Sequence, residues 1–350
     1  MPRIQSLATA IPPHRLDQAR ARLEMARLCR GRPHLERLLP VFDRSGVDTR
    51  FLVHPPEWYL EPRTFDERNR EYVARGLELA ESAARACLAR TDTRAHEIDH
   101  VLVVTTTGLA TPSLDALLAA RLGLRDDVRR WPLFGLGCAG GAGALLRAGE
   151  LLAAQPSGRA LVVSVEVCSM VFSMRAETST ALVGTALFGD GAAAALLVGD
   201  QVPGDGIRIA AGRSYLLPDA RHLMGWEFTS DGMRLILSRD IPAAVAARVA
   251  PAVEEFLKGR GLCPRTVTHA ILHPGGPKVM ATYRSAFGIA EAAVSLARES
   301  MRRYGNLSSA AVLVMLSDLV ASGRPGRGDT GLVLALGPGF AAEMLALSWP

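Results

Sequence analysis

The sequence has few of the features that mark disulfide-rich, zinc-binding or redox proteins. Its five cysteines lie far apart, at Cys29, Cys87, Cys138, Cys168 and Cys263. No two of them form a CxxC pair. This spacing argues against a zinc site or a disulfide framework, and it is typical of a protein kept in a reducing cytoplasm. We expect no bound metal.

Lysine and aromatic residues are also scarce. Lys258 and Lys278 are the only lysines, and the net charge of +5 comes from arginines interleaved with acidic residues. Aromatic residues make up 5% of the chain, so a basic groove with stacking platforms is absent and we expect no nucleic-acid partner. The chain has no charge-free apolar run long enough to span a membrane, and its N-terminus has no signal-peptide pattern. We predict a cytoplasmic protein without a membrane span.

Hydrophobic patterns are abundant, and they alternate between two periods. Buried-strand runs occur at 101–108, 160–167, 191–198, 269–276 and 331–340, and helical patterns occur at 16–43, 66–90, 240–260 and 277–288. This alternation predicts an α/β protein. Because the second half repeats the order of the first, we predict a duplication, with halves at 1–215 and 216–350 and the active site between them.

Cys138 lies in FGLGCAGGAG, between a short strand and an apolar helix. The glycines permit a sharp turn, and the helix N-terminus lowers the pKa of a thiol. The pattern therefore favours a nucleophile, although a small buried side chain beside packing glycines is the alternative.

Two further residues could assist such a nucleophile. His273 leaves a strand into a Pro-Gly-Gly turn, at the edge where α/β sheets bind ligands. Asn306 lies in RYGNLSSA at a helix start, where asparagine is also a good N-cap. A cysteine nucleophile needs a partner for its thiolate and donors for an oxyanion, and together these residues meet that need.

These segments together resemble the type III polyketide synthases, the chalcone and stilbene synthase family of the thiolase fold. The resemblance covers nearly the whole chain and is densest in GLGCAGG, ALVGTALFGDGAAAAL, HPGGP, YGNLSSA and GPGF. It implies a thiolase-like αβαβα layered fold, a homodimer, and Cys138, His273 and Asn306 as the catalytic triad.

The same resemblance implies the residues that contact substrate. Phe188 is the expected gatekeeper aromatic between the coenzyme A tunnel and the cavity, with core packing as the alternative role. The implied cavity positions also include Thr106, Gly184, Ser308 and the loop Gly337, Pro338, Gly339 and Phe340. Arg44, Arg50 and Gly276 match the coenzyme A contacts, although the two arginines are equally well explained as solvated surface residues.

Four positions differ from the plant enzymes. Thr111 replaces a methionine that reaches into the partner's cavity, Cys168 and Val171 replace threonines, and Leu235 replaces a second gatekeeper phenylalanine. The chain is most similar to bacterial members that make long-chain alkylpyrones and alkylresorcinols. A wider, more apolar cavity suits an acyl tail, and neutral drift is the alternative explanation.

The expected mechanism follows from the resemblance. A Cys138 thiolate, held beside imidazolium His273, takes an acyl group from its coenzyme A thioester. Malonyl-CoA loses carbon dioxide, and the enolate, stabilised by His273 and Asn306, attacks the acyl group in repeated cycles. Acyl-CoA and malonyl-CoA are thus the expected partners, and no cofactor is expected.

Two alternatives share most of these features. A ketoacyl synthase III-type enzyme uses Cys, His and Asn for one condensation with an acyl carrier protein, but the HPGGP, YGN and GPGF segments favour the polyketide synthase. A non-catalytic thiolase-fold subunit that pairs with an active paralogue is the second alternative, which the intact triad disfavours.

Overall fold

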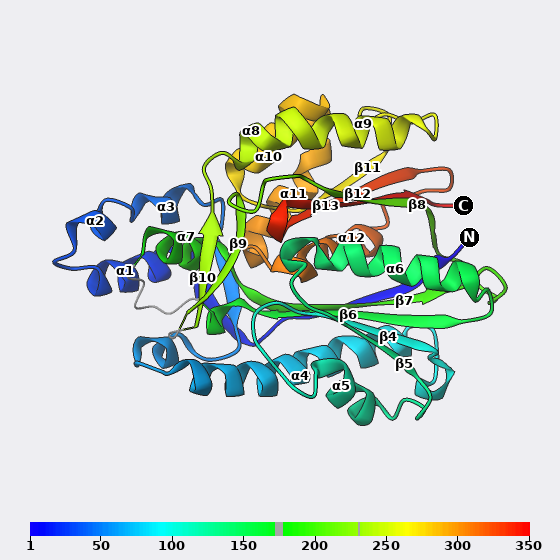
Figure 1. Cartoon of the computed structure of the whole chain (residues 1–350), viewed down its shortest axis with the longest axis horizontal. Helices are drawn as coiled ribbons and strands as arrows, with labels where there is room; N and C mark the ends of the chain where they lie inside the picture. Colours follow the sequence, from blue (N-terminus) through cyan, green and yellow to red (C-terminus); the bar gives the residue numbers. More distant parts are fainter. Residues whose placement is uncertain (172–177, 230–231) are drawn as a thin grey trace.

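The computed structural model describes residues 1–171, 178–229 and 232–350. Its main sheet has nine strands in the order β11-β12-β13-β8-β1-β7-β6-β4-β5 (Figure 1). These strands are β1 (Arg3–Ala10), β4 (His100–Val104), β5 (Arg129–Leu133), β6 (Arg159–Val167), β7 (Asp190–Val198), β8 (Ile207–Leu216), β11 (His269–Leu272), β12 (Thr330–Gly337) and β13 (Ala341–Ser348). Two antiparallel two-stranded sheets lie outside it: β2 (His14–Asp17) with β3 (Thr49–Leu52), and β9 (Met224–Thr229) with β10 (Gly232–Leu237).

Helices cover both outer faces of the sheet, and two further helices, α6 (Gly140–Ala154) and α12 (Ala311–Ala321), lie between its N-terminal and C-terminal parts (Figure 1). The other helices are α1 (Gln18–Leu28), α2 (Pro33–Glu36), α3 (Pro40–Arg44), α4 (Phe65–Ala89), α5 (Leu114–Leu122), α7 (Ser179–Leu187), α8 (Ile241–Ala244), α9 (Ala250–Lys258), α10 (Pro277–Phe287) and α11 (Glu291–Tyr304). The π-helical segment Val245–Val249 joins α8 to α9.

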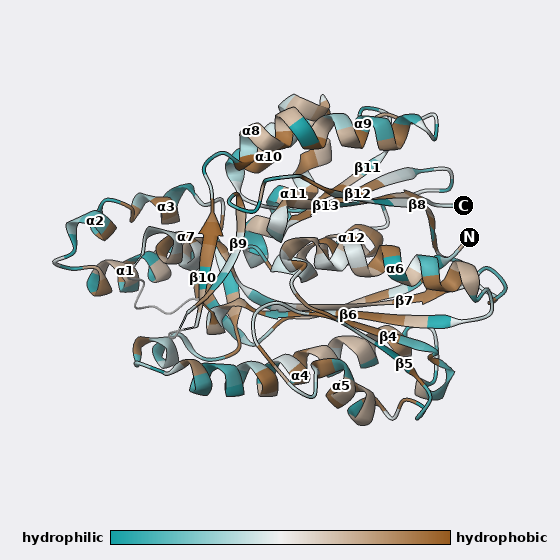
Figure 2. Ribbon diagram, in the orientation of Figure 1, coloured by the Kyte–Doolittle hydropathy of each residue, from teal (hydrophilic) through white to brown (hydrophobic). Residues whose placement is uncertain are grey.

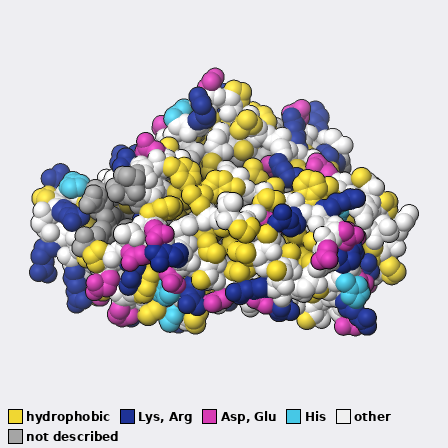
Figure 3. Space-filling model, turned by 60° about the horizontal axis from the view of Figure 1, so that its bottom comes forward, with side chains coloured by type: hydrophobic (Ala, Val, Ile, Leu, Met, Phe, Trp, Pro, Cys, Tyr) yellow, Lys and Arg dark blue, Asp and Glu magenta, His cyan; other side chains and the backbone are white. Residues whose placement is uncertain are grey.

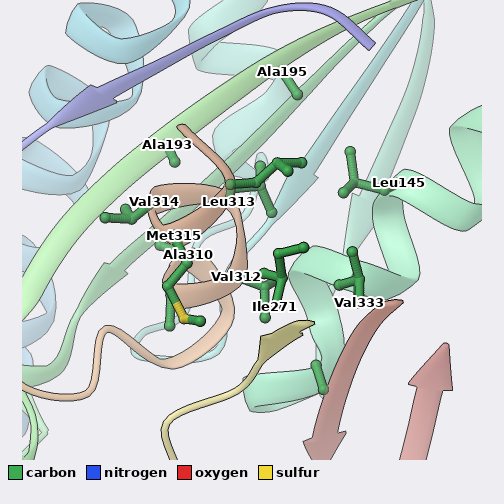
Figure 4. Packing of buried hydrophobic residues seen from close by; sticks show 14 of the residues in the cluster. Leu145, Ala193, Ala195, Ile271, Ala310, Val312, Leu313, Val314, Met315 and Val333 are labelled. Carbon is green, nitrogen blue, oxygen red and sulfur yellow. The ribbon is translucent and has the colours of Figure 1, made fainter. Parts of the chain in front are cut away.

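Alternating strand residues separate the molecule into five layers. In β6, Ala160 and Val162 face the inner core with α6 and α12, whereas Leu161 and Val163 face the outer core with α4. The C-terminal strands alternate in the same way between the inner core and a second outer core with α9 and α10. Side chains such as Leu145 and Leu313 fill the inner core (Figure 4). Since successive strand residues point to opposite faces, both sheet halves are covered on two sides, which gives the predicted αβαβα order.

The two halves follow the same strand path. In the N-terminal half the strands run β5-β4-β6-β7-β1, and in the C-terminal half they run β11-β12-β13-β8. Numbered in chain order within each half, these are the orders 3-2-4-5-1 and 2-3-4-1, and the two become identical when the edge strand β5 is left out of the N-terminal half. Strand β8 pairs along its length with β13. Strand β8 thus belongs to the C-terminal half of the sheet, whereas the predicted boundary after residue 215 assigns nearly all of this strand to the N-terminal half.

The structure refines the predicted elements. The pattern over 16–43 is not one continuous helical region, because β2 precedes α1 and because Pro33 and Pro40 each start a new short helix. The strand predicted at 331–340 ends at Gly337, and the chain returns as β13. Strands β1, β8 and β13 had no prediction. Hydrophobic residues dominate the sheet strands, whereas hydrophilic residues gather on outward parts of α1 and α4 (Figure 2).

Two kinds of feature are absent from the described residues. No helix among them combines the length and apolar character needed to cross a membrane. In the same part of the chain, no group of three His, Cys, Asp or Glu side chains is arranged to hold a metal ion. All five cysteines have free thiols.

Candidate active site

Cys138 lies in a tight turn between β5 and α6, as predicted. The 3₁₀ turn Gly137–Ala139 carries it, and Gly137 has a φ of 48°. A Cβ at Gly137 would lie 2.4 Å from Pro338 Cδ, so the turn requires glycine for space as well as for its left-handed backbone. The Gly137 amide donates to Thr106 Oγ1 at 3.2 Å. Cys138 is half-buried at the start of the helix.

The fold brings His273 and Asn306 to the same place. His273 follows β11 and is buried, and its amide donates to Leu334 O at 2.8 Å. The Asn306 Oδ1 atom accepts the Ser308 amide at 2.8 Å. This bond leaves the Asn306 NH2 group directed to the site, where Nδ2 lies 3.5 Å from His273 Nε2. The Asn306 side chain also hydrogen-bonds to Cys138 and lowers the pKa of its thiol.

Burial favours the neutral forms of the cysteine and the histidine. The pKa of Cys138 is raised to about 12, mainly by desolvation. The hydrogen bond with Ser308 opposes this rise, and the charge of Glu166 adds to it. Desolvation lowers the pKa of His273 to about 4. Among the described residues no hydrogen bond joins the two, and Cys138 Sγ donates to Ser308 Oγ at 3.6 Å. These shifts favour a neutral thiol and a neutral imidazole over the predicted pair of thiolate and imidazolium.

The sequence prediction missed Glu166, a fully buried carboxyl group beside the nucleophile. It accepts the Thr106 amide at 3.1 Å, Thr107 Oγ1 at 2.8 Å, and a short hydrogen bond from Ser309 Oγ. Ser308 Oγ lies 3.4 Å from its second oxygen. Desolvation raises the pKa of Glu166. A charged residue inside the apolar run ALVVSVEV was the signal that could have revealed it.

Four of the predicted cavity residues form one apolar wall. Cys168 and Leu235 are buried and pack with Val171 and Phe188. Trp226 and Leu237, which the prediction did not include, complete the wall. Burial raises the pKa of Cys168 well above its usual value, and electrostatic interaction with Glu166, Asp190 and the Cys138 thiol raises it further, so the wall lies near the nucleophile. Gly184 lies within α7 and accepts the Phe188 amide at 2.9 Å.

The Gly337–Phe340 loop packs against the turn that carries Cys138. A Cβ at Gly337 would lie 2.2 Å from Leu136 O, and Gly339 has a φ of 73°. Phe340 behaves differently from the prediction. Its side chain is buried in the outer C-terminal core rather than in the apolar wall, and its carbonyl accepts the Leu217 amide. The loop therefore shapes the site through its backbone.

Three further predicted residues, Thr111, Arg44 and Gly276, lie outside the apolar wall. Thr111 is exposed on the segment before α5. Arg44 is exposed, and the loop after it approaches the α10 start, since a Cβ at Gly46 would lie 3.4 Å from Pro277 Cγ. Gly276, with a φ of 115°, directly precedes that helix.

Arg50 is a correction to the predicted coenzyme A contacts. It is 2% exposed, and its guanidinium donates to protein oxygens at the C-terminus of α7. Both guanidinium nitrogens NH1 and NH2 are thus already bonded inside the protein, so a surface phosphate is not its partner.

Comparison with known proteins decides the family. The model for the N-terminal domain of chalcone and stilbene synthases matches residues 5–201, and the model for the C-terminal domain matches residues 208–349. The chain belongs to the chalcone and stilbene synthase family. It is a type III polyketide synthase and hence an acyl-transferring enzyme.

Relatives of this polyketide synthase match over nearly their whole length. It is 39% identical to 1,3,6,8-tetrahydroxynaphthalene synthase of Streptomyces peucetius subsp. caesius, over 99% of this chain and 93% of that protein. It is 36% identical to a putative chalcone synthase of Bacillus subtilis (strain 168), over 99% and 98%. The crystal structure of 1,3,6,8-tetrahydroxynaphthalene synthase from Streptomyces coelicolor A3(2) superposes with a TM-score of 0.94 at 30% identity, over 99% of both chains. The thiolase-like α/β fold is therefore confirmed.

Proposed function

We propose that this polyketide synthase loads a long-chain fatty acyl group from coenzyme A onto Cys138 and extends it with malonyl-CoA. The product is an alkylpyrone or an alkylresorcinol. The observation that carries the proposal is the apolar wall of Cys168, Val171, Phe188 and Leu235 beside the nucleophile. An alkyl tail gains about 0.8 kcal/mol for each methylene that it buries on such a surface.

The proposed chemistry uses three side chains. The Cys138 thiol gives its proton to neutral His273 as its sulfur attacks the thioester, and coenzyme A leaves as the thiolate while His273 keeps the proton. Decarboxylation of malonyl-CoA then forms an enolate whose oxygen accepts hydrogen bonds from Asn306 and His273. Such donors are worth roughly 3–4 kcal/mol each. The enolate carbon attacks the acyl thioester, and Cys138 leaves as the thiolate, which takes its proton back from His273 before the next cycle.

We also propose that no metal or organic cofactor takes part. The nucleophile, the base and the oxyanion donors are all protein groups in this scheme. Turnover of malonyl-CoA should survive exhaustive dialysis against a chelator. Loss of activity that a divalent metal restores would contradict this.

Product analysis tests the acyl-tail proposal directly. The enzyme is incubated with malonyl-CoA and a series of straight-chain acyl-CoAs, and the products are identified by mass spectrometry. Long-chain alkylpyrones or alkylresorcinols are expected. Leu235→Phe should shift the preference to shorter starters, because it narrows the wall. Ile236→Phe is the matched control, since Ile236 is exposed on the opposite face of β10. Equal starter preference in both variants would count against the wall.

A second candidate is synthesis of 1,3,6,8-tetrahydroxynaphthalene from malonyl-CoA alone. The similarity to two synthases of that name favours it. Incubation with malonyl-CoA as the sole substrate separates the candidates. Efficient formation of the naphthalene, unaffected by added acyl-CoA, would establish the second candidate and exclude the first.

We propose in addition that two copies of the chain associate. A band of hydrophobic side chains crosses one face of the molecule (Figure 3). Leu109, Trp131 and Phe134 are 40%, 39% and 50% exposed, and β5 is an edge strand. A patch of this kind marks a protein interface in most soluble proteins. Thr111 lies in the same loop as Leu109, so association would place it near the partner's cavity. Light scattering should give a dimer, and Phe134→Glu should give a monomer.

A further inference from the structure

Arg50 places a buried cation at the end of a helix. It lies in β3 and is 2% exposed. Its NH1 group makes a short hydrogen bond to Thr185 O and a longer one, at 3.4 Å, to Phe188 O. Its NH2 group donates to Ala186 O at 3.2 Å. These are carbonyls at the C-terminus of α7, where helical partners are lacking and the helix dipole favours positive charge.

Gln18 provides a second anchor for the same helix end. Its Oε1 accepts a short hydrogen bond from Arg50, and its Nε2 donates to Ala186 O at 2.9 Å. The same nitrogen reaches Ser45 Oγ at 2.8 Å and Phe42 O at 3.2 Å. The end of α7 is therefore fixed to α1, to α3 and to β3, three elements that otherwise have no direct part in the chemistry.

A buried carboxylate balances the charge of Arg50. Asp190 attracts the guanidinium electrostatically, against the desolvation that lowers the pKa of Arg50 to about 10. Its oxygens accept the Val53 amide at 3.0 Å, the Ser169 amide at 2.8 Å and Ser169 Oγ at 2.6 Å. Asp190 thus connects β3 to the residue that follows Cys168 in the apolar wall.

The segment held by Arg50 is bonded to the catalytic asparagine. Asn306 donates its amide to Leu187 O at 2.8 Å, and Gly189 donates its amide to Asn306 O at 3.1 Å. Phe188 and Asn306 therefore form an isolated bridge. The two backbones are so close that a Cβ at Gly305 would lie 2.7 Å from Leu187 O. A shift of residues 185–188 must move Asn306 as well.

We propose that Arg50 is a positioning residue that sets the places of Phe188 and Asn306 by holding the C-terminus of α7. The proposal rests on the roles proposed above for these two residues. Arg50 touches neither substrate nor the reacting atoms in this view. It acts through Thr185, Ala186 and the backbone bridge.

Arg50→Met tests the proposal, because methionine keeps most of the volume and removes every donor. Arg3→Met is the matched control. Arg3 is also a buried arginine, but it begins β1 and donates to one backbone carbonyl, that of Val202. Activity is expressed per mole of folded enzyme isolated by size-exclusion chromatography, so that unfolded enzyme does not count. We expect Arg50→Met to lower kcat for malonyl-CoA decarboxylation by about 10–100-fold, with KM changed less than kcat. Arg3→Met should keep the wild-type kcat.

Hydrogen exchange gives a second readout that needs no activity. Exchange in peptides covering 185–190 and 304–309 should rise in Arg50→Met and stay unchanged in Arg3→Met. Gln18→Leu, which removes only the second anchor, should change both readouts in the same direction by less, and it replaces Arg50→Met if that variant does not fold. Arg50→Lys should lie between wild type and Arg50→Met.

The outcomes separate this proposal from the proposed function. If wild type turns over malonyl-CoA while Arg50→Met and Arg3→Met have equal kcat per folded enzyme and equal exchange, Arg50 has no positioning role. If wild type does not turn over malonyl-CoA, the proposed function fails, and the exchange pattern alone then decides for or against the role of Arg50.

Discussion

The two central helices enter the active site in similar ways but bring different chemistry. Helix α6 follows β5 and the 3₁₀ turn Gly137–Ala139, whereas α12 follows the 3₁₀ turn Ser308–Ala310. Both turns lie between the two sheet halves, and α6 packs directly on the second turn, since a Cβ at Gly141 would lie 2.2 Å from Ser309 O. The first turn carries the nucleophile, and the second follows the amide donor.

The strand before each turn explains the difference. The N-terminal half has β5 at its edge, and the C-terminal half has no strand in the equivalent position within the described residues. There the chain makes a single bridge, from Asn306 to Phe188 of the other half. Without its own sheet neighbour, Asn306 is placed by the N-terminal half. A duplicated fold has thus become asymmetric, with nucleophile and donor on opposite sides of one site.

The largest expected effect is at the first turn. Cys138→Ala should abolish acyl loading and reduce product formation by about 10⁴-fold or more, because no other side chain there replaces the nucleophile. Transfer of a radiolabelled acyl group to protein measures loading. Malonyl-CoA decarboxylation should persist in part, since its donors are on the other side. Condensation at the wild-type rate would disprove the assignment of Cys138.

The second turn should separate the two half-reactions. Asn306→Ala should lower decarboxylation by about 10²–10³-fold, the usual effect of losing one oxyanion donor, while acyl loading falls much less. Release of labelled carbon dioxide and acyl transfer are measured on the same preparation. Equal losses in both reactions would show that Asn306 has a structural role instead.

Glu166 lies between the two turns and should control the thiol of the first. Burial raises the pKa of Cys138, and the negative charge of Glu166 raises it further. Glu166→Gln should therefore lower this pKa and speed the alkylation of Cys138 by iodoacetamide several-fold near neutral pH, as followed by mass spectrometry of the peptide that contains Cys138. In wild type, alkylation should keep rising with pH well above 9, because only the thiolate reacts. A rate that levels off near neutral pH would contradict the raised pKa.

The contact between the helices predicts the smallest effect. Gly141→Ala should destabilise the fold by about 1–3 kcal/mol, because its Cβ would overlap Ser309 O. Gly149→Ala, in the same helix, is the control. Its Cβ would lie 3.5 Å from Ile209 Cδ1, an ordinary contact, so better helix propensity should leave it neutral or slightly more stable. Thermal unfolding compares the two, and equal melting temperatures would show that the helices can separate without cost.

The sequence by itself was enough for the parts that depend on local pattern. Long runs of one period predicted β6, β7 and α4, and the glycines around Cys138 predicted its turn. The motifs then identified the family, because HPGGP, YGNLSSA and GPGF occur in one chain in the expected order. Edge and short strands such as β1 and β13 were not predicted, since their alternation is weak without knowledge of their neighbours.

Tertiary structure decided what depends on partners from distant segments. The sequence cannot distinguish the exposed Arg44 from the buried Arg50, six residues later, because the carbonyls that bind Arg50 come from α7. Glu166 belongs to the site because the hydroxyl groups of Ser308 and Ser309, from the other half of the chain, contact its carboxyl group in the folded protein. The pKa shifts of Cys138 and His273 toward their neutral forms likewise follow from burial, which no local pattern encodes.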